Sequence, residues 1–398
     1  MSQRQNGRTY DNEDGQVGAD GQGLSSESEL RLQEWKRQKE EAKKNQPDYR
    51  RYKIETPPPR AHSPHEAVSL DLDGQVANLT KHRPIYRGRE KLLKMLLEMY
   101  IDVSQIEDSV WEKVPLWDEI QAAHGKSPVV YGLDTCEAFR KSVPAVDRHI
   151  GIAGLFSSGT NLLAILLQHN CAIPEGVAKW GRKKGHGMEW QVPYGKHSPP
   201  RFRDSGHKVR NFLGEIPINQ EMITVMTRNP YDWIGSMCRH AYTIRWNHTK
   251  RKCPNLIEGT NTSTRARFGP GRTEHESIIH MWNDWYGGYY HNKTYPRLMV
   301  RFEDTIFYPK EVSEQICSCV GGVLMPPKED DGIFHYVIDS AVNGKGHGSA
   351  DKRNGLLDGW IKYGRKSRPG TFTKKDLDFI EKYADKEILE TMRWSRPE

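Results

Sequence analysis

The sequence lacks any long hydrophobic run. No stretch approaches the roughly 18 uninterrupted apolar residues that a membrane-spanning helix requires, and residues 1–23 are polar, unlike a secretion signal. We therefore expect no membrane span, and we expect the cytoplasm to be the compartment.

Cysteine is also scarce, with six residues in a chain of 398. The six are scattered, only Cys317 and Cys319 lie close together, and no histidine or second cysteine cluster completes a zinc pattern. This distribution favours structural or free thiols over a disulfide scaffold, and it predicts no metal site.

Two features keep the Golgi lumen as an alternative compartment. Cys238 and Cys253 form a pair that would suit an oxidising environment. Four sequons of the type N-x-[ST], which matter only in the secretory pathway, begin at Asn78, Asn247, Asn261 and Asn292.

A strong excess of one charge is absent as well. The formal net charge is +7, from 59 Lys and Arg against 52 Asp and Glu. Spread over this length, it favours a small anionic ligand at a focused site over a surface that follows nucleic acid. The apolar share of 36% is sufficient for a buried core.

The composition changes along the chain and predicts three regions. Residues 1–65 are poor in apolar side chains and end in a proline-rich stretch, which predicts a disordered tail. Residues 66–147 have helical spacing over 91–100 and 111–123, which predicts a helical lead-in region. Residues 148–398 form the main domain.

Within that domain, short apolar runs alternate with helical segments. The runs Ile150–Gly154, Met222–Met226 and Leu298–Phe302 predict buried strands. Helices are expected after each of them, around 162–167, over 231–242 and over 309–320, and a last amphipathic helix over 374–392. This alternation predicts an α/β fold with a central parallel β-sheet flanked by helices.

The segment Gly154–Asn161 connects the first strand to its helix. In such sheets a glycine-rich turn and a helix N-terminus face anionic ligands. The segment fits G-x-x-x-x-G, but Thr160 and Asn161 replace the lysine and the Ser/Thr of a nucleotide-triphosphatase loop. A tight turn without a ligand is the alternative, and the hydroxyls of Ser157, Ser158 and Thr160 favour an anion.

A second motif follows the second strand. The sequence from Arg228 to Ser236 reads R-N-P-x-D-x-x-x-S. Arg228 is expected to leave the strand end as a fork-shaped phosphate donor, and Ser236 lies further along the next helix, so that both reach one anion.

Together the two motifs resemble the sulfotransferases that use 3′-phosphoadenosine-5′-phosphosulfate (PAPS), over roughly residues 148–395. The resemblance implies a P-loop NTPase-like sulfotransferase fold, with PAPS as co-substrate and no metal. It places the 5′-phosphosulfate on Ser157, Ser158, Gly159, Thr160 and Asn161, and the 3′-phosphate on Arg228 and Ser236.

Further likenesses are Leu298–Asp304 followed by Tyr308 and Pro309, and the segment 343–346, which makes Lys345 a nucleotide ligand. The strings GLFSSGTNLL, VPYGKHSP, SMCRH and CPNL resemble a branch of sulfotransferase-domain proteins common in algae and other protists.

One position departs from the family. Most of its members carry Lys or Arg directly before S-G-T, where this chain has Ser157. Sulfuryl transfer needs positioning and charge stabilisation, so the missing cation is costly unless another replaces it, and without a replacement the chain would be a slow or inactive PAPS binder. Lys196 is the first candidate, ahead of Lys183 and Lys184.

The implied reaction moves SO₃ from PAPS to an acceptor hydroxyl or amine, releases 3′,5′-ADP and needs a base. His197, which follows Lys196, is the first choice. His207 lies 21 residues before Arg228, as in the cytosolic branch of the family, and is the second. His186 and Glu189 come after these.

The acceptor is a small molecule or a carbohydrate whose identity the sequence does not fix. The aromatic stretch 281–290 suits the core better than an acceptor pocket. A non-catalytic nucleotide-binding adaptor and a nucleotide-dependent phosphotransferase are the alternatives to a sulfotransferase.

Overall fold

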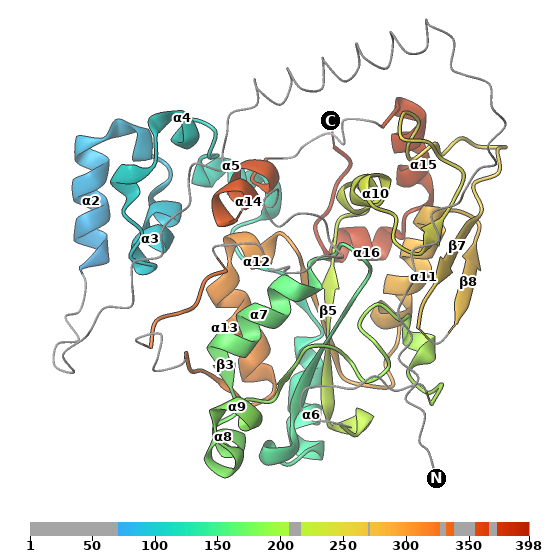
Figure 1. Ribbon diagram of the computed structural model, residues 1–398, viewed down its shortest axis with the longest axis horizontal. Helices are drawn as coiled ribbons and strands as arrows, with labels where there is room; N and C mark the ends of the chain where they lie inside the picture. Colours follow the sequence, from blue (N-terminus) through green and yellow to red (C-terminus); the bar gives the residue numbers. More distant parts are fainter. Residues whose placement is uncertain are drawn as a thin grey trace, which may run out of the picture. The chain divides into compact units, whose positions relative to one another are not determined.

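The computed structural model describes residues 71–206, 216–269, 271–326, 332–337, 355–365 and 372–397 (Figure 1). The predicted tail, His207 and Lys345 lie outside these residues.

A five-stranded sheet forms the centre of the domain. Its strands run in the order β1-β9-β5-β2-β4, and all neighbours are parallel except β1, which pairs antiparallel with β9. The bounds are β1 Val130–Tyr131, β2 His149–Gly154, β4 Met188–Glu189, β5 Glu221–Thr227 and β9 Arg297–Arg301. The three predicted buried strands are confirmed as β2, β5 and β9, because each apolar run is long enough to be covered on both faces.

Successive residues of these strands enter two separate cores. Ile152, Met226 and Val300 belong to the first, whereas Ala153 and Val225 belong to the second. Helices cover both faces (Figure 1). The first core includes residues of α7 Thr160–Asn170, α12 Asp304–Phe307, α13 Pro309–Cys319 and α14 Leu356–Tyr363. The second includes residues of α10 Pro230–Arg239, α11 Ile278–Tyr290, α15 Lys374–Tyr383 and α16 Lys386–Thr391.

Residues 71–147 are largely helical and extend the first core. Their helices are α2 Leu72–His82, α3 Glu90–Glu98, α4 Asp108–Trp111, α5 Trp117–His124 and α6 Cys136–Ser142. The predicted helix over 111–123 is wrong as one element. It is divided at Pro115, and Glu119 caps the start of α5 by accepting from the Leu116 N–H at 2.8 Å.

Two other predicted boundaries differ. The helix expected over 374–392 is divided, because Asp385 caps a new helix by accepting from the Ile388 N–H at 3.1 Å. The helix expected to reach residue 242 ends at Arg239.

Smaller elements surround the main sheet. One sheet contains β6 Ile244–Arg245, β7 Thr264–Arg267 and β8 Arg272–His275. A second pairs β3 Cys171–Ala172 with β10 Val323–Leu324, and two short helices are α8 Pro174–Trp180 and α9 Arg182–Gly185.

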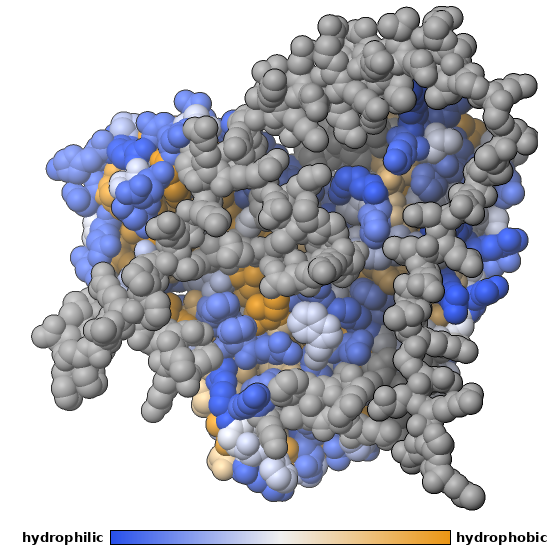
Figure 2. All heavy atoms as spheres, in the orientation of Figure 1, coloured by the Kyte–Doolittle hydropathy of each residue, from blue (hydrophilic) through white to orange (hydrophobic). Residues whose placement is uncertain are grey.

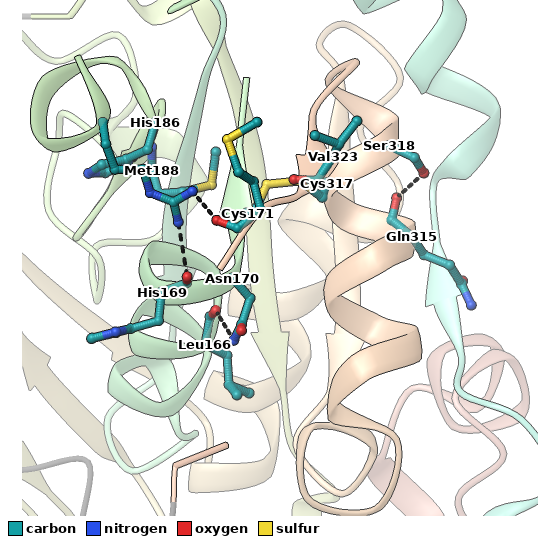
Figure 3. Close-up of a disulfide and its surroundings, with 12 residues drawn as sticks. Leu166, His169, Asn170, Cys171, His186, Met188, Gln315, Cys317, Ser318 and Val323 are labelled. Atoms are coloured by element: carbon teal, nitrogen blue, oxygen red, sulfur yellow. Dashed lines mark hydrogen bonds between the residues drawn. A yellow bond between two sulfur atoms is a disulfide. The ribbon is translucent and has the colours of Figure 1, made fainter. Parts of the chain in front are cut away.

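The expectation of structural or free thiols is wrong, since all six cysteines are bridged, and of these bridges the sequence had indicated only the pair Cys238 and Cys253. The disulfides are Cys136–Cys319, Cys171–Cys317 and Cys238–Cys253, with Cα–Cα distances of 4.8, 5.7 and 5.8 Å. Figure 3 shows the second, which joins the strand after α7 to α13. Pairing was hidden in the sequence because the partners of the first two bridges lie 183 and 146 residues apart.

The coloured surface in Figure 2 is mostly hydrophilic, with apolar residues in separate small areas. Among the helices that the structure describes, none is long and apolar enough to cross a bilayer.

Candidate functional site

The candidate site lies where the strands β2 and β5 end. From β2 the chain crosses to β4 on one side and then to β5 on the other, so the direction of winding reverses between β2 and β5. Open α/β sheets bind ligands at this point, outside the carboxyl ends of the strands. Gly154 and Arg228 stand there, one at the end of β2 and the other directly after β5.

The loop after β2 is shaped by two residues with positive φ. Ser157 has φ +56° and Gly159 has φ +95°. A Cβ on Gly159 would lie 2.4 Å from the Phe302 ring, so the loop packs directly against the end of β9. Helix α7 then begins at Thr160 without a side-chain cap. The Leu162 N–H already donates to the Gly159 carbonyl at 2.9 Å, so the groups suited to an anion are the N–H groups of Thr160 and Asn161 before it.

The loop hydroxyls differ in what they can offer. Ser158 is fully buried and donates its hydroxyl to the Leu155 carbonyl at 2.7 Å, so it holds the turn together. Ser157 and Asn161 are half-buried, while Thr160 is 5% exposed. Of the predicted loop ligands, Ser158 thus acts within the loop.

Arg228 ties the loop to the end of β5. Its Nη1 donates to the Ser157 carbonyl at 2.5 Å and its Nη2 to the Tyr363 hydroxyl at 3.0 Å. Its guanidinium lies 4.7 Å from the centre of the Phe302 ring. The side chain is buried, and its Nε has no hydrogen-bond partner. An unpaired buried donor of this kind is costly unless a ligand accepts from it.

Burial alone would lower the pKa of Arg228, but its neighbours outweigh that effect and raise it. The neighbours include Tyr363, Asp232 and Glu303. The guanidinium is consequently a permanent cation at the sheet edge.

Ser236 lies in α10, whose start is capped by Asn229 through the Tyr231 N–H at 3.1 Å. The Ser236 hydroxyl donates to the Asp232 carbonyl at 3.1 Å and accepts from Arg239 Nη2 at 2.9 Å. Arg239 therefore adds a second cation to this helix face, one that the sequence motif did not single out.

Lys196 reaches the start of α7. The segment after β4 runs beside β2, as the bond from the Gly154 N–H to the Lys196 carbonyl at 2.8 Å shows. The Nζ of Lys196 donates to Asn161 Oδ1 at 2.6 Å and lies 4.6 Å from the centre of the Trp190 ring. Burial lowers the pKa of this amine to about 8.

His197 lies against the same loop. Its Nδ1 is 2.7 Å from the Gly154 carbonyl oxygen, and its ring contacts that of Phe156 at 4.4 Å. Because a carbonyl can only accept, Nδ1 carries the hydrogen, and in the neutral ring Nε2 keeps the lone pair. Trp285 Nε1 donates to the His197 carbonyl at 2.9 Å and so holds the backbone of His197 against α11.

The remaining candidates lie elsewhere. His186 lies just before β4 and Glu189 is the last residue of that strand, which pairs with Ile150 and Gly151 at the start of β2, away from the loop. Burial lowers the pKa of His186 to about 4, and the ring accepts from the Met188 N–H at 2.8 Å. Lys183 is exposed in α9, near that same end.

The comparisons with known proteins contribute no relative. No family model, curated protein or solved structure matches this chain.

Sequence reasoning gave no role to the buried carboxylates beside Arg228, although one of them, Asp232, is the acidic residue of the motif from Arg228 to Ser236. Glu303 is 2% exposed, neither of its carboxyl oxygens has a hydrogen-bond partner, and burial raises its pKa to about 7. Burial also raises the pKa of Asp232. Glu303 directly follows the third predicted strand, and this position at a strand end could have indicated a site residue. Tyr363 had none, because α14 approaches Arg228 from 135 residues further along the chain.

The aromatic stretch 281–290 is confirmed as core, since Trp282, Trp285, Tyr286 and Tyr289 are all buried. One side of α11 nevertheless borders a cavity of about 710 Å³, whose other walls include Pro199, Pro200, Arg203 and Tyr295. Pro199, one of its wall residues, lies two residues after His197 in the chain. Its volume lies in the range of small-molecule sites.

Proposed function

We propose that this chain is a PAPS-dependent sulfotransferase with a P-loop-like fold, which moves a sulfuryl group to an acceptor hydroxyl or amine and releases 3′,5′-ADP. The observation that carries the proposal is the bond between Arg228 and the Ser157 carbonyl. It joins a helix N-terminus and a buried guanidinium, two elements suited to anions, at the position where the winding of the sheet reverses.

The two elements suit the two ends of one nucleotide. The N–H groups at the start of α7 are placed for the 5′-phosphosulfate, where negative charge develops on the departing phosphate. Arg228 Nε, together with Ser236 and Arg239, is suited to the 3′-phosphate.

Lys196 supplies the positive charge that is missing at position 157, where the chain has serine. Its ammonium contacts Asn161 in the first turn of α7, so it stands beside the position of the departing phosphate. Neutralising charge there during bond cleavage is the main help that sulfuryl transfer needs from the protein.

His197 is the base in this proposal. As the acceptor oxygen or nitrogen forms its bond to sulfur, its proton passes to Nε2, and the bond from sulfur to the phosphate oxygen breaks. The bond from Nδ1 to the Gly154 carbonyl holds the ring in this tautomer. The cavity behind the segment is the proposed position for part of a small-molecule or carbohydrate acceptor.

The test is transfer of radiolabelled sulfate from PAPS to a panel of carbohydrate and small-molecule acceptors. We expect labelled product with the wild-type chain and at least about 100-fold less with His197→Ala. Binding of 3′,5′-ADP without transfer to any acceptor would instead favour the nucleotide-binding adaptor. Labelled phosphate transfer from ATP would favour a phosphotransferase.

A further inference from the structure

The disulfides constrain where the protein matures. All six cysteines are bridged, and no free cysteine is found among them. Two bridges join α13 and its C-terminal end to segments 146 and 183 residues earlier, so they form only as the domain folds. Disulfides of this kind form and persist in oxidising compartments, whereas the thiols of cytosolic proteins are kept reduced. This favours the lumen over the cytoplasm that the sequence suggested.

Two of the four sequons lie on exposed loops next to a bridge. Asn247 is exposed inside the ring closed by Cys238 and Cys253, and its sequon ends at Thr249. Asn261 is exposed shortly after that ring, before β7, and its sequon ends at Ser263.

The side-chain amides of both asparagines are accessible. Within the described part of the chain, neither Nδ2 donates a hydrogen bond, although Asn261 Oδ1 accepts from the Ser263 N–H at 3.1 Å. A bulky polar glycan is tolerated in a folded protein only where the asparagine points to solvent and holds no contact that the fold needs.

The other two sequons are less suitable. Asn78 lies within α2, and the Thr80 hydroxyl of its sequon is buried. Asn292 is half-buried beside the cavity, and its Oδ1 accepts from both the N–H and the hydroxyl of Thr294, each at 2.7 Å.

We propose that this protein matures in the lumen of the secretory pathway and carries N-linked glycans on Asn247 and Asn261. The co-reactant is an oligosaccharide on a lipid diphosphate. Nδ2 forms a bond to the first sugar carbon, the bond from that carbon to the diphosphate oxygen breaks, and Nδ2 loses one proton. The proposal is independent of sulfotransferase activity.

The test uses the full-length protein isolated from its own cells, with thiols alkylated at lysis. Release of glycans by an amidase in heavy-oxygen water converts each glycosylated asparagine to a labelled aspartate, which peptide mass spectrometry locates. We expect the label at residues 247 and 261 and no alkylated cysteine.

Asn247→Gln and Asn261→Gln should each remove one glycan-sized step in electrophoretic mobility. The matched control Asn219→Gln changes an exposed asparagine outside any sequon and should remove none. An unlabelled peptide at either site, or six alkylated cysteines, overturns the proposal.

Discussion

Arg228 makes several contacts that have to be separated experimentally. It bonds the loop carbonyl of Ser157 and the Tyr363 hydroxyl while its Nε stays unpaired. Hydrogen bonds to a charged group contribute about 1.5–3 kcal/mol each, so removing the guanidinium is expected to affect a bound anion more than a surface arginine would.

We predict that Arg228→Ala weakens 3′,5′-ADP binding by about 10- to 100-fold, measured by titration calorimetry. Arg228→Lys keeps the charge but loses the fork-shaped donor, and its affinity for 3′,5′-ADP should lie between those of the wild type and Arg228→Ala. Arg265→Ala removes an exposed arginine paired with Glu274 and should bind like the wild type. Melting of each variant without ligand identifies loss of folding, and unchanged affinity in a folded Arg228→Ala protein would contradict the assignment.

Lys196 predicts a pH dependence. Its folded pKa of about 8 lies below the ordinary 10.5, since burial disfavours the charged form. The cation is therefore present below about pH 8 and is lost as the pH rises through 8. The cost of burying the charge applies in full below about pH 8 and is relieved gradually as the pH rises from 8 to 10.5.

We accordingly expect the transfer rate of the wild type to fall above about pH 8, and Lys196→Met to be about 100-fold slower without that alkaline fall. Lys179→Met is the control, because Lys179 lies over Trp180 at 4.6 Å, just as Lys196 lies over Trp190, but is exposed. An alkaline fall that persists in Lys196→Met would remove Lys196 from the mechanism.

At the scale of elements, the loop between β2 and α7 depends on Gly159. Its positive φ is strained for any other residue, and an added Cβ would meet the Phe302 ring. A larger residue at position 159 would therefore cause both backbone strain and a clash with Phe302.

Gly159→Ala should lower the free energy of unfolding by about 2–4 kcal/mol, from backbone strain and overpacking together. Gly259→Ala has a similar φ of +76° with open space around it, and should lose only about 1–2 kcal/mol. Denaturant unfolding measures both. Equal losses would show that contact with Phe302 is not what the loop requires.

The three main strands could be predicted because their apolar runs are covered on both faces and carry a local signal. The break at Asp385 was missed because the apolar spacing continues across it, while the cap that ends the pattern is a single side chain. Likewise, the sequence predicted the loop and Arg228 as ligands for the two ends of one nucleotide, which stays a prediction. It did not predict the contact of Arg228 with Tyr363, which depends on packing of distant segments.

At the scale of the whole molecule, the disulfides were the largest departure from expectation. Few and scattered cysteines look like isolated thiols in a sequence, because pairing is decided by the fold and not by spacing. The bridges at α13 close long loops and should contribute more than the short bridge near β6.

Replacing both Cys171 and Cys317 by Ala should lower the free energy of unfolding by about 4 kcal/mol, because with Cys136–Cys319 intact this bridge still closes a ring of roughly 40 residues. The matched pair Cys238→Ala and Cys253→Ala removes the bridge whose cysteines are 15 residues apart and should lower the free energy of unfolding by about 3 kcal/mol. Urea unfolding under oxidising conditions compares them. A larger loss from the short bridge would contradict the dependence on loop length.

The proposed activity requires a site that recognises a nucleotide by its 3′-phosphate. The most direct measurement is the affinity of the wild-type chain for 3′,5′-ADP against its isomer 5′-ADP and against ATP with Mg²⁺, by titration calorimetry. We expect 3′,5′-ADP to bind at least about 10-fold more tightly than either, since a phosphate on Arg228 is worth more than 1.4 kcal/mol. Equal binding of the two isomers, or tighter binding of ATP with Mg²⁺, would contradict the PAPS site.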